Sequence, residues 1–165
     1  MVRVEPLSGA WAEALTEGED TFSARFGIPV VDGWAVFPEA LPGALGAASE
    51  DGDRWGTHLF FDDDGALVGW GGWKGPPVDG VAELGYAVAP ARRGRGIATR
   101  VVRQLISRAR DAGVDMVIAH TLPEESPSTG VLRRCGFVRT GEVAVSDDGV
   151  AGEVWHWELD PCRTG

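Results

Sequence analysis

The residues best suited to chemistry in this sequence are residues 88–99, where basic side chains alternate with small ones between an apolar run and an amphipathic run. The N-terminus of a helix has unpaired N–H groups and about half a positive charge, and small residues let a phosphate reach that backbone. Gly94, Gly96 and Ala98 give such access. The stretch therefore predicts a binding site for a small anion that carries several charges.

Two familiar phosphate-binding loops do not fit this stretch. A P-loop requires G-x-x-x-x-G-K-[ST], which the chain lacks. A dinucleotide-binding loop requires G-x-G-x-x-G, and here Gly94-Arg95-Gly96 is followed by Thr99 where the third glycine should stand. The spacing therefore indicates another kind of phosphate loop.

The positive charge of the chain is concentrated in the same region. The formal net charge is −10, yet seven of the fifteen basic residues lie between Arg92 and Arg110, where there is no Asp or Glu. Nucleic-acid binding normally needs an extended positive surface, and the acidic remainder of the chain argues against it. The intervening glycines favour anion binding by Arg92, Arg93 and Arg95. The other four arginines fit the solvated face of a helix.

Hydrophobic periodicity predicts the elements that position this loop. Apolar residues recur every fourth position from Ile97 to Ala109, and Gly113 supplies a stop signal, which predicts an amphipathic helix. A second helix is expected between the Ser126-Pro127 cap and Gly136. We expect strands, separated by turn residues, at residues 57–61, 66–74, 81–88, 116–121, 137–145 and 150–159.

The first third of the chain has weaker signals. Residues 2–4 are expected to form a short strand, and two irregular helices are expected in residues 8–48. The residues expected to interrupt these helices are Gly27, Pro29, Gly33, Pro38 and Pro42.

The order of these elements predicts an α/β (α+β) fold, a mixed and mostly antiparallel sheet flanked by helices. With 165 residues, 44% of them hydrophobic, the chain fits one globular domain over residues 1–165. No apolar run approaches the roughly 18 residues of a membrane span, and no signal peptide is evident at Met1, so we expect a cytoplasmic protein without a membrane partner. A homodimer is the usual soluble oligomer.

The loop sequence Arg93-Gly94-Arg95-Gly96-Ile97-Ala98 resembles the acetyl-CoA loop of the GNAT superfamily of N-acetyltransferases, whose pattern is R/Q-x-x-G-x-G/A. The strand before it, residues 83–88, resembles the corresponding strand of the branch that contains ribosomal-protein N-acetyltransferases. Residues 123–137 resemble that branch's P-E-N-x-x-S-x-x-V-L-x-x-x-G-F segment. Together the three matches span about a third of the chain, in the family's order and spacing.

The resemblance implies a GNAT fold that uses acetyl-CoA as co-substrate. The backbone from Arg93 to Thr99 would hold the pyrophosphate, and the pantetheine arm would bind the strand edge near Val88 like an added strand. The residues implied in coenzyme binding are Ala87, Val88, Arg93, Gly94, Arg95, Gly96, Ile97, Ala98 and Thr99.

The same resemblance suggests two catalytic residues. Glu83, on the strand leading to the coenzyme, is the candidate general base for an amine, and its alternative role is a solvated or cross-strand-paired carboxylate. Ser128, at the serine of the branch's motif, is the candidate hydrogen-bond donor to the leaving thiolate, and its alternative role is a helix cap. The sequence departs from the branch at Glu125, which replaces Asn, and at Leu132, where many members have a tyrosine acid. The chain's one tyrosine is Tyr86.

Other reactive side chains suggest no further chemistry. Cys135 falls on the apolar stripe of a helix and is expected in the core. Two cysteines, Cys135 and Cys162, are too few for a disulfide framework. His58, His120 and His156 lie on separate expected strands without ligand spacing, so no metal is expected. Trp70 and Trp73 either line an acceptor cleft or pack in the core.

The sequence therefore predicts an N-acetyltransferase that moves an acetyl group from acetyl-CoA to an amine, by direct attack in a ternary complex. The acceptor would be a protein N-terminus or a small-molecule amine. Residues 8–48 and 141–155 would form its binding site, and the acidic charge of the rest of the chain favours a cationic acceptor. The alternative is a non-catalytic acyl-CoA-binding sensor or interaction module of the same fold.

Overall fold

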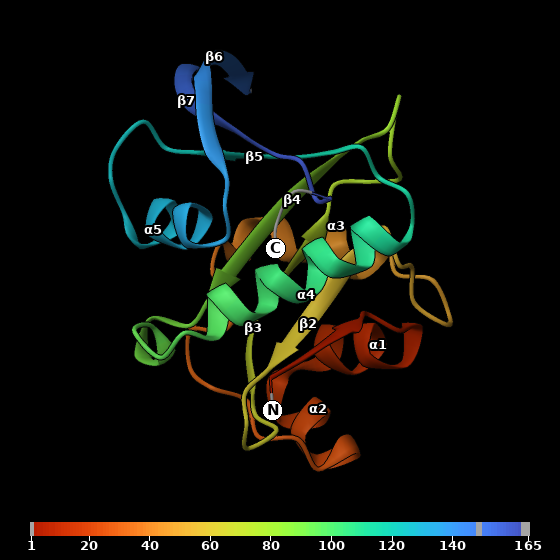
Figure 1. Ribbon diagram of the computed structural model, residues 1–165. Coiled ribbons are helices and arrows are strands. Elements are labelled where there is room, and N and C mark those ends of the chain that lie inside the picture. The colour runs from red at the N-terminus through yellow and green to blue at the C-terminus, as the bar shows by residue number, and fades with distance from the viewer. Residues whose placement is uncertain (1, 148–149, 163–165) are drawn as a thin grey trace.

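A seven-stranded sheet organises the computed structural model, which describes residues 2–147 and 150–162 (Figure 1). The strand order is β1-β2-β3-β4-β5-β7-β6. Neighbouring strands are antiparallel except for β4 and β5, which are parallel. The mixed, mostly antiparallel sheet predicted from the sequence is therefore confirmed. The strands are β1 (Arg3–Pro6), β2 (Thr57–Phe61), β3 (Leu67–Trp73), β4 (Val81–Val88), β5 (Met116–Thr121), β6 (Val138–Asp147) and β7 (Val150–Leu159).

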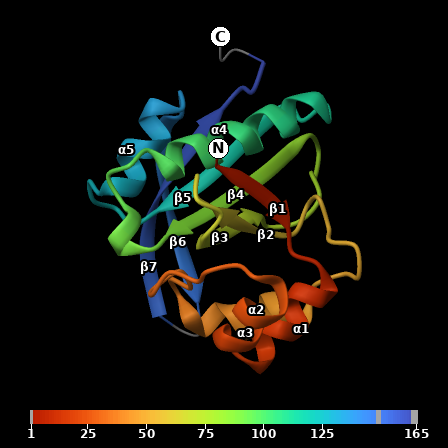
Figure 2. The same cartoon turned by 90° about the horizontal axis from the view of Figure 1, so that it is seen from below.

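Helices cover the two faces of the sheet as separate layers, as Figure 2 shows. One layer consists of α4 (Ile97–Asp111) and α5 (Pro127–Arg134), and the other of α1 (Gly9–Glu17), α2 (Glu19–Phe26) and α3 (Leu41–Gly46). Two short 3₁₀ turns, η1 (Pro38–Ala40) and η2 (Pro90–Arg92), complete the set. The sheet therefore separates two hydrophobic cores, one beneath each layer.

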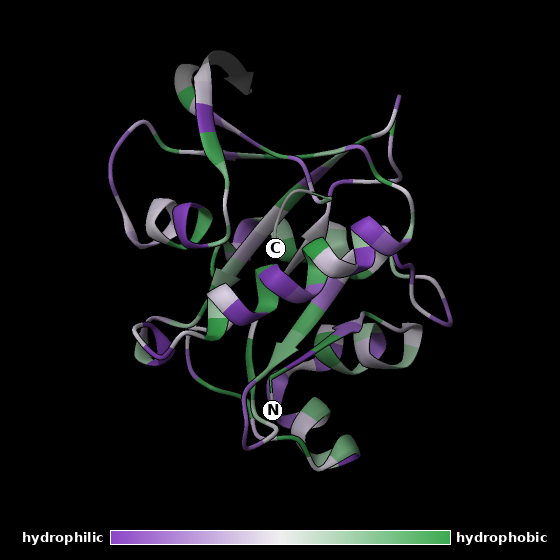
Figure 3. Ribbon diagram, in the orientation of Figure 1, coloured by the Kyte–Doolittle hydropathy of each residue, from purple (hydrophilic) through white to green (hydrophobic). Residues whose placement is uncertain are grey.

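The helix α4 forms where its apolar period predicts it. Its buried side chains include Val101, Leu105 and Ala109, which lie on one face and pack in the core with β4 and β5. Figure 3 shows hydrophobic and hydrophilic residues alternating along this helix. Gly113 follows it with a φ of 84°, a left-handed conformation that glycine adopts readily, and so ends the helix as expected.

The N-terminal third differs most from the sequence expectations. The strand expected at residues 2–4 is shifted to Arg3–Pro6, and three α-helices form where two were expected. Gly18, with a φ of 146°, ends α1 and at once begins α2. Pro42 was expected to break a helix, yet it lies in the first turn of α3, where its missing N–H group costs nothing. The turn between the last two expected strands, at 137–145 and 150–159, lies partly outside the described residues.

One ionisable side chain, His58 of β2, is almost completely buried. It is 1% exposed, and its Nδ1 lies 2.9 Å from the carbonyl oxygen of Gly56. Burial lowers the pKa of His58 below its ordinary value, and the hydrogen bond to Gly56 only partly opposes this. The folded protein therefore holds this ring in its neutral form.

We predict that His58 makes the protein less stable in mild acid. Because the pKa of the folded ring is lowered, its contribution is fully present above about pH 6.5, the ordinary histidine value, and is lost as the pH falls from there through the folded pKa. Urea unfolding at about pH 7.5 and about pH 5.5 tests this, since His58→Gln should lose less stability over that interval than the wild type. Equal losses in the two proteins would contradict it.

Candidate active site

The loop between β4 and α4 presents unpaired backbone donors to solvent. Among the described residues, the N–H groups of residues 94–99 have no hydrogen-bond acceptor, and no side chain caps α4. Gly94 and Gly96 have φ angles of 79° and 74°, which favour glycine. A methyl group at either position would meet no atom within 4 Å, so the space before the loop is open. The loop can therefore receive an anion without rearranging.

Two arginines of this region form ion pairs with acids of a neighbouring turn. Arg92 lies 3.6 Å from Oδ2 of Asp62, and Arg100 donates to both carboxylate oxygens of Asp63 at 3.2 and 3.3 Å. These acids belong to the β2–β3 turn, where Asp62 also accepts from two backbone N–H groups. Arg93 and Arg95 are exposed beside the unpaired donors, and Nε of Arg93 donates to the carbonyl oxygen of Val88 at 3.3 Å. The sequence analysis grouped Arg92 with the anion-binding arginines, and in the structure it lies beside Asp62.

The sheet opens beside this loop. The parallel pairing of β4 with β5 ends at Leu84 and Ala119. Residues 85–88 continue to pair with β3 on one side but have no strand partner on the other among the described residues. The expected coenzyme residues Ala87 and Val88 lie on this free edge. An extended ligand can add to such an edge as a strand would.

The candidate base Glu83 lies on the opposite face of β4 from the α4–α5 core, because Ala82 and Leu84 point into that core. Its side chain is 32% exposed, and its Oε2 lies 3.3 Å from Nδ1 of His120 on β5. Nε2 of His120 in turn lies 2.9 Å from Nδ1 of His156, and Nε2 of His156 lies 3.3 Å from Oε1 of Glu158. Both expectations for Glu83 are therefore compatible with its position, at the opening and beside a cross-strand partner.

The pairing of His120 with His156 was missed from the sequence. The two residues are 36 positions apart, and they meet because β5 and β7 pair with His120 opposite His156. Neither spacing nor periodicity predicts that register. No group of three or more His, Cys, Asp or Glu residues suited to a metal ion occurs in residues 2–147 and 150–162.

The other candidate catalytic residue, Ser128, is exposed in the first turn of α5. Ser126 caps this helix by accepting from the N–H of Thr129, so capping does not require Ser128. The carbonyl oxygen of Ser128 accepts from the hydroxyl of Tyr86 at 2.9 Å. Burial raises the pKa of Tyr86 far above its ordinary value, so this hydroxyl stays protonated and links β4 to α5.

Three further positions singled out in the sequence, Leu132, Glu125 and Cys135, have contacts that explain them structurally. Leu132 has no acidic group, and it is fully buried in the core. Glu125 accepts from Oγ1 of Thr129 and pairs with Arg133. The bond from Arg133, and to a lesser extent that from Thr129, lowers the pKa of the Glu125 carboxyl. Cys135 is buried as expected, and burial raises the pKa of its thiol, which disfavours a nucleophilic thiolate.

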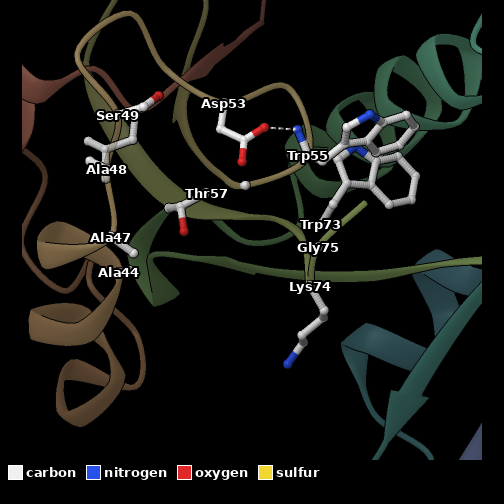
Figure 4. Close-up of a pocket in the computed structure, with 12 residues that line it drawn as sticks. Ala44, Ala47, Ala48, Ser49, Asp53, Trp55, Thr57, Trp73, Lys74 and Gly75 are labelled. Atoms are coloured by element: carbon white, nitrogen blue, oxygen red, sulfur yellow. Dashed lines mark hydrogen bonds between the residues drawn. The ribbon is translucent and has the colours of Figure 1, made fainter. Parts of the chain in front are cut away.

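A cavity of about 260 Å³ lies between α3, the segment before β2 and the end of β3 (Figure 4). Trp55 and Trp73 form one wall, with their rings edge to face at 5.5 Å. Lys74 points away from Asp53, and its backbone N–H donates to the carbonyl oxygen of Glu83. The cavity therefore borders the strand of the candidate base. Trp70 instead donates its indole N–H to the carbonyl oxygen of Val36, which fixes it within the fold.

Comparisons with known proteins agree with this geometry. A family model described as an acetyltransferase (GNAT) domain matches residues 21–138. A mycothiol acetyltransferase of Nocardia farcinica is 36% identical over 101 residues, which are 61% of this chain and 30% of that protein. Glucosamine 6-phosphate N-acetyltransferase 1 of Oryza sativa is 47% identical over 51 residues, 31% of this chain and 29% of that one. The chain thus matches less than a third of the length of each relative.

Solved structures share the fold over nearly the whole chain. The ribosomal-protein-S5-alanine acetyltransferase of Vibrio fischeri aligns with a TM-score of 0.66 at 14% identity, covering 99% of this chain and 95% of that one. At that identity the likeness shows the fold alone.

No helix within residues 2–147 and 150–162 has the length and apolar character of a membrane span.

We predict that Tyr86→Phe lowers the free energy of unfolding by about 1 kcal/mol, because it removes the hydrogen bond that ties β4 to α5. Ser128→Ala is the matched control, since it removes the serine hydroxyl but keeps the carbonyl acceptor. Urea denaturation measures both. A loss in Ser128→Ala as large as that in Tyr86→Phe would contradict this assignment.

Proposed function

Because the chain belongs to the GNAT acetyltransferase family, we propose that it transfers the acetyl group of acetyl-CoA to the nitrogen of an amine. The observation that carries the proposal is the row of unpaired N–H groups at residues 94–99, beside the unpaired edge of residues 85–88. Coenzyme A has a pyrophosphate that can accept from the N–H groups and an extended, amide-containing arm that can pair with the strand edge.

The residues present fit the coenzyme. The open loop of residues 93–99, including Gly94, Gly96, Ile97, Ala98 and Thr99, would hold the pyrophosphate through its N–H groups. Arg93 and Arg95 would add positive charge. The pantetheine arm would lie along Ala87 and Val88. A backbone N–H at this strand end would then stabilise negative charge on the thioester oxygen as the amine attacks.

The reaction would proceed by direct attack in a ternary complex. A lysine-like amine is protonated at neutral pH, with a solution pKa near 10.4, so a base must take its proton before attack. Glu83 would accept that proton. The nitrogen would attack the carbonyl carbon, and the C–S bond would break as coenzyme A leaves with a hydrogen bond from Ser128.

The positions of Glu83 and Ser128 support this division of roles. Glu83 faces the layer of α1–α3, whereas Ser128 belongs to the layer of α4 and α5, and the opening between β4 and β5 separates them. The amine and the coenzyme would therefore approach the carbonyl carbon from opposite faces of the sheet.

The acceptor would be a cationic amine, either a protein N-terminus or a small molecule. The net charge of −10 and the seven-arginine segment leave the rest of the chain strongly acidic, which favours a cation. The cavity lined by Lys74, whose backbone bonds that of Glu83, would bind part of this molecule. Names of similar proteins include alanine and spermidine acetyltransferases, whose acceptors have amino groups.

One observation favours a second function, an acyl-CoA-binding module without turnover. Leu132 is buried where many family members place a tyrosine acid. Because a thiolate with a pKa near 8.5 leaves readily, a hydrogen bond can replace a proton donor, and we favour the enzyme.

We predict that acetyl-CoA binds with micromolar affinity in isothermal titration calorimetry and that Gly96→Glu abolishes binding. The added carboxylate would repel the pyrophosphate at the helix N-terminus. Ala112→Glu, at the other end of α4, is the matched control and should bind like the wild type. Gly96→Ala separates backbone strain from charge and should bind more weakly than the wild type but more tightly than Gly96→Glu. Absence of wild-type binding at millimolar coenzyme would refute the proposal.

We predict that Glu83→Gln lowers kcat by about 10²–10³-fold, because the amide cannot take the proton of the amine. The affinity for acetyl-CoA should not change, since Glu83 faces the other side of the sheet. Release of coenzyme A from acetyl-CoA with a panel of primary amines measures turnover. A variant with wild-type kcat would remove Glu83 from the mechanism.

A further inference from the structure

Four side chains form a continuous line across β4, β5 and β7. The contacts run from Glu83 to His120 at 3.3 Å, on to His156 at 2.9 Å, and on to Glu158 at 3.3 Å. Each contact joins a nitrogen to an oxygen or a nitrogen of the next residue. The two imidazole rings lie 4.8 Å apart at 59° to each other, so they meet through their nitrogens rather than by stacking.

The number of protons in this line is its unusual property. Three contacts need three bridging protons, whereas a neutral imidazole carries one N–H group and a carboxylate carries none. Two neutral rings therefore fill two contacts. The third is completed only when one more proton resides on Glu83, on Glu158 or on a ring. The line can therefore hold one additional proton. Both of its ends are carboxylates, so either end can accept or release that proton.

The two carboxylates have no direct connection. Glu83 is opposite Ile118 in the β4–β5 register, and Ile118 is opposite Glu158 in the β5–β7 register. The apolar side chain of Ile118 therefore stands between them on the same face. The histidine pair, one step further along the strands, provides the polar connection around it.

The two ends of the line are similarly exposed in the free protein, Glu83 at 32% and Glu158 at 39%, and a bound amine would make them differ. His120 and His156 are 27% and 20% exposed, and Glu158 lies on β7, two strands away from Glu83. An amine bound over Glu83 would cover that end from water. Glu158 would remain in contact with solvent.

We propose that His120, His156 and Glu158 carry the proton that Glu83 takes from the amine out to solvent, an inference that rests on the proposed function. The N–H bond of the ammonium group breaks and an O–H bond forms on Glu83. This proton passes to Nδ1 of His120 while Nε2 of His120 gives its proton to Nδ1 of His156. Nε2 of His156 gives its proton to Glu158, which releases it to water.

One proton enters at Glu83 and one leaves at Glu158, and no electrons are transferred. The rings then return to their first tautomers by exchange with water, which reaches both. Glu83 is thereby restored as a base while the acetylated product is still bound. His156 and Glu158 act through Glu83 and are positioning residues that do not contact the amine.

The test is steady-state kinetics of wild type and His156→Ala with acetyl-CoA and a panel of primary amines, in H₂O and in D₂O. The variant should lose about tenfold in kcat, a fraction of what a general base supplies, with KM for both substrates unchanged. Its solvent isotope effect should rise, and added imidazole should restore its kcat. Imidazole should leave the wild type unaffected. Asp111→Asn, a carboxylate that is 73% exposed at the end of α4, is the control and should retain wild-type kinetics.

Glu158→Gln provides a second variant if His156→Ala does not fold, and it should show the same loss of kcat and the same rise in the isotope effect. Absence of any wild-type turnover overturns the proposed function and the relay together. Wild-type turnover with unchanged kcat in the variants overturns the relay alone. A loss of kcat in His156→Ala that imidazole does not restore assigns the histidine a structural role and also overturns the relay.

Discussion

The early end of the β4–β5 pairing is the constraint on which the site depends. Backbone N–H and C=O groups inside a protein need partners, and two parallel strands that separate leave a row of them without any. In this chain the separation begins after Leu84 and Ala119, directly before the loop whose own N–H groups are unpaired. The opening and the loop together present unpaired backbone groups side by side, and Glu83, Ser128 and Tyr86 lie on the elements that flank them.

Part of the positive charge near the loop is paired within the chain. The sequence concentrates arginines in this segment, and Asp62 and Asp63 of the β2–β3 turn pair with two of them, Arg92 and Arg100. These pairs tie the arginine segment to the β2–β3 turn, while Arg93 and Arg95 stay exposed. The acidic turn would therefore contribute to the proposed anion site without contacting the anion.

Local sequence patterns predicted the elements that surround the loop. Both helices of one layer were predicted, α4 from the apolar residue at every fourth position between Ile97 and Ala109, and α5 from the Ser126-Pro127 cap. These signals are local, because a helix face and a helix cap each involve residues close in the sequence. The Glu83–His120–His156 cluster was not predictable, since it depends on the register of β5 against β7. The short helices of residues 9–46 were also missed in part, because each is stabilised mainly by packing on the sheet and local propensity is weak in so few residues.

The division of the core into two layers has a consequence for how such a chain can diversify. The aromatic cluster of Trp11, Phe22 and Phe26 packs beneath α1 and α2 and shares only the sheet with the residues under α4. Substitutions in one layer therefore perturb the other only through the backbone of the strands. The packing of α1–α3 can therefore change while the packing beneath α4 and α5 stays as it is. The sheet thus makes the two cores mechanically independent of each other in all but the strand backbones.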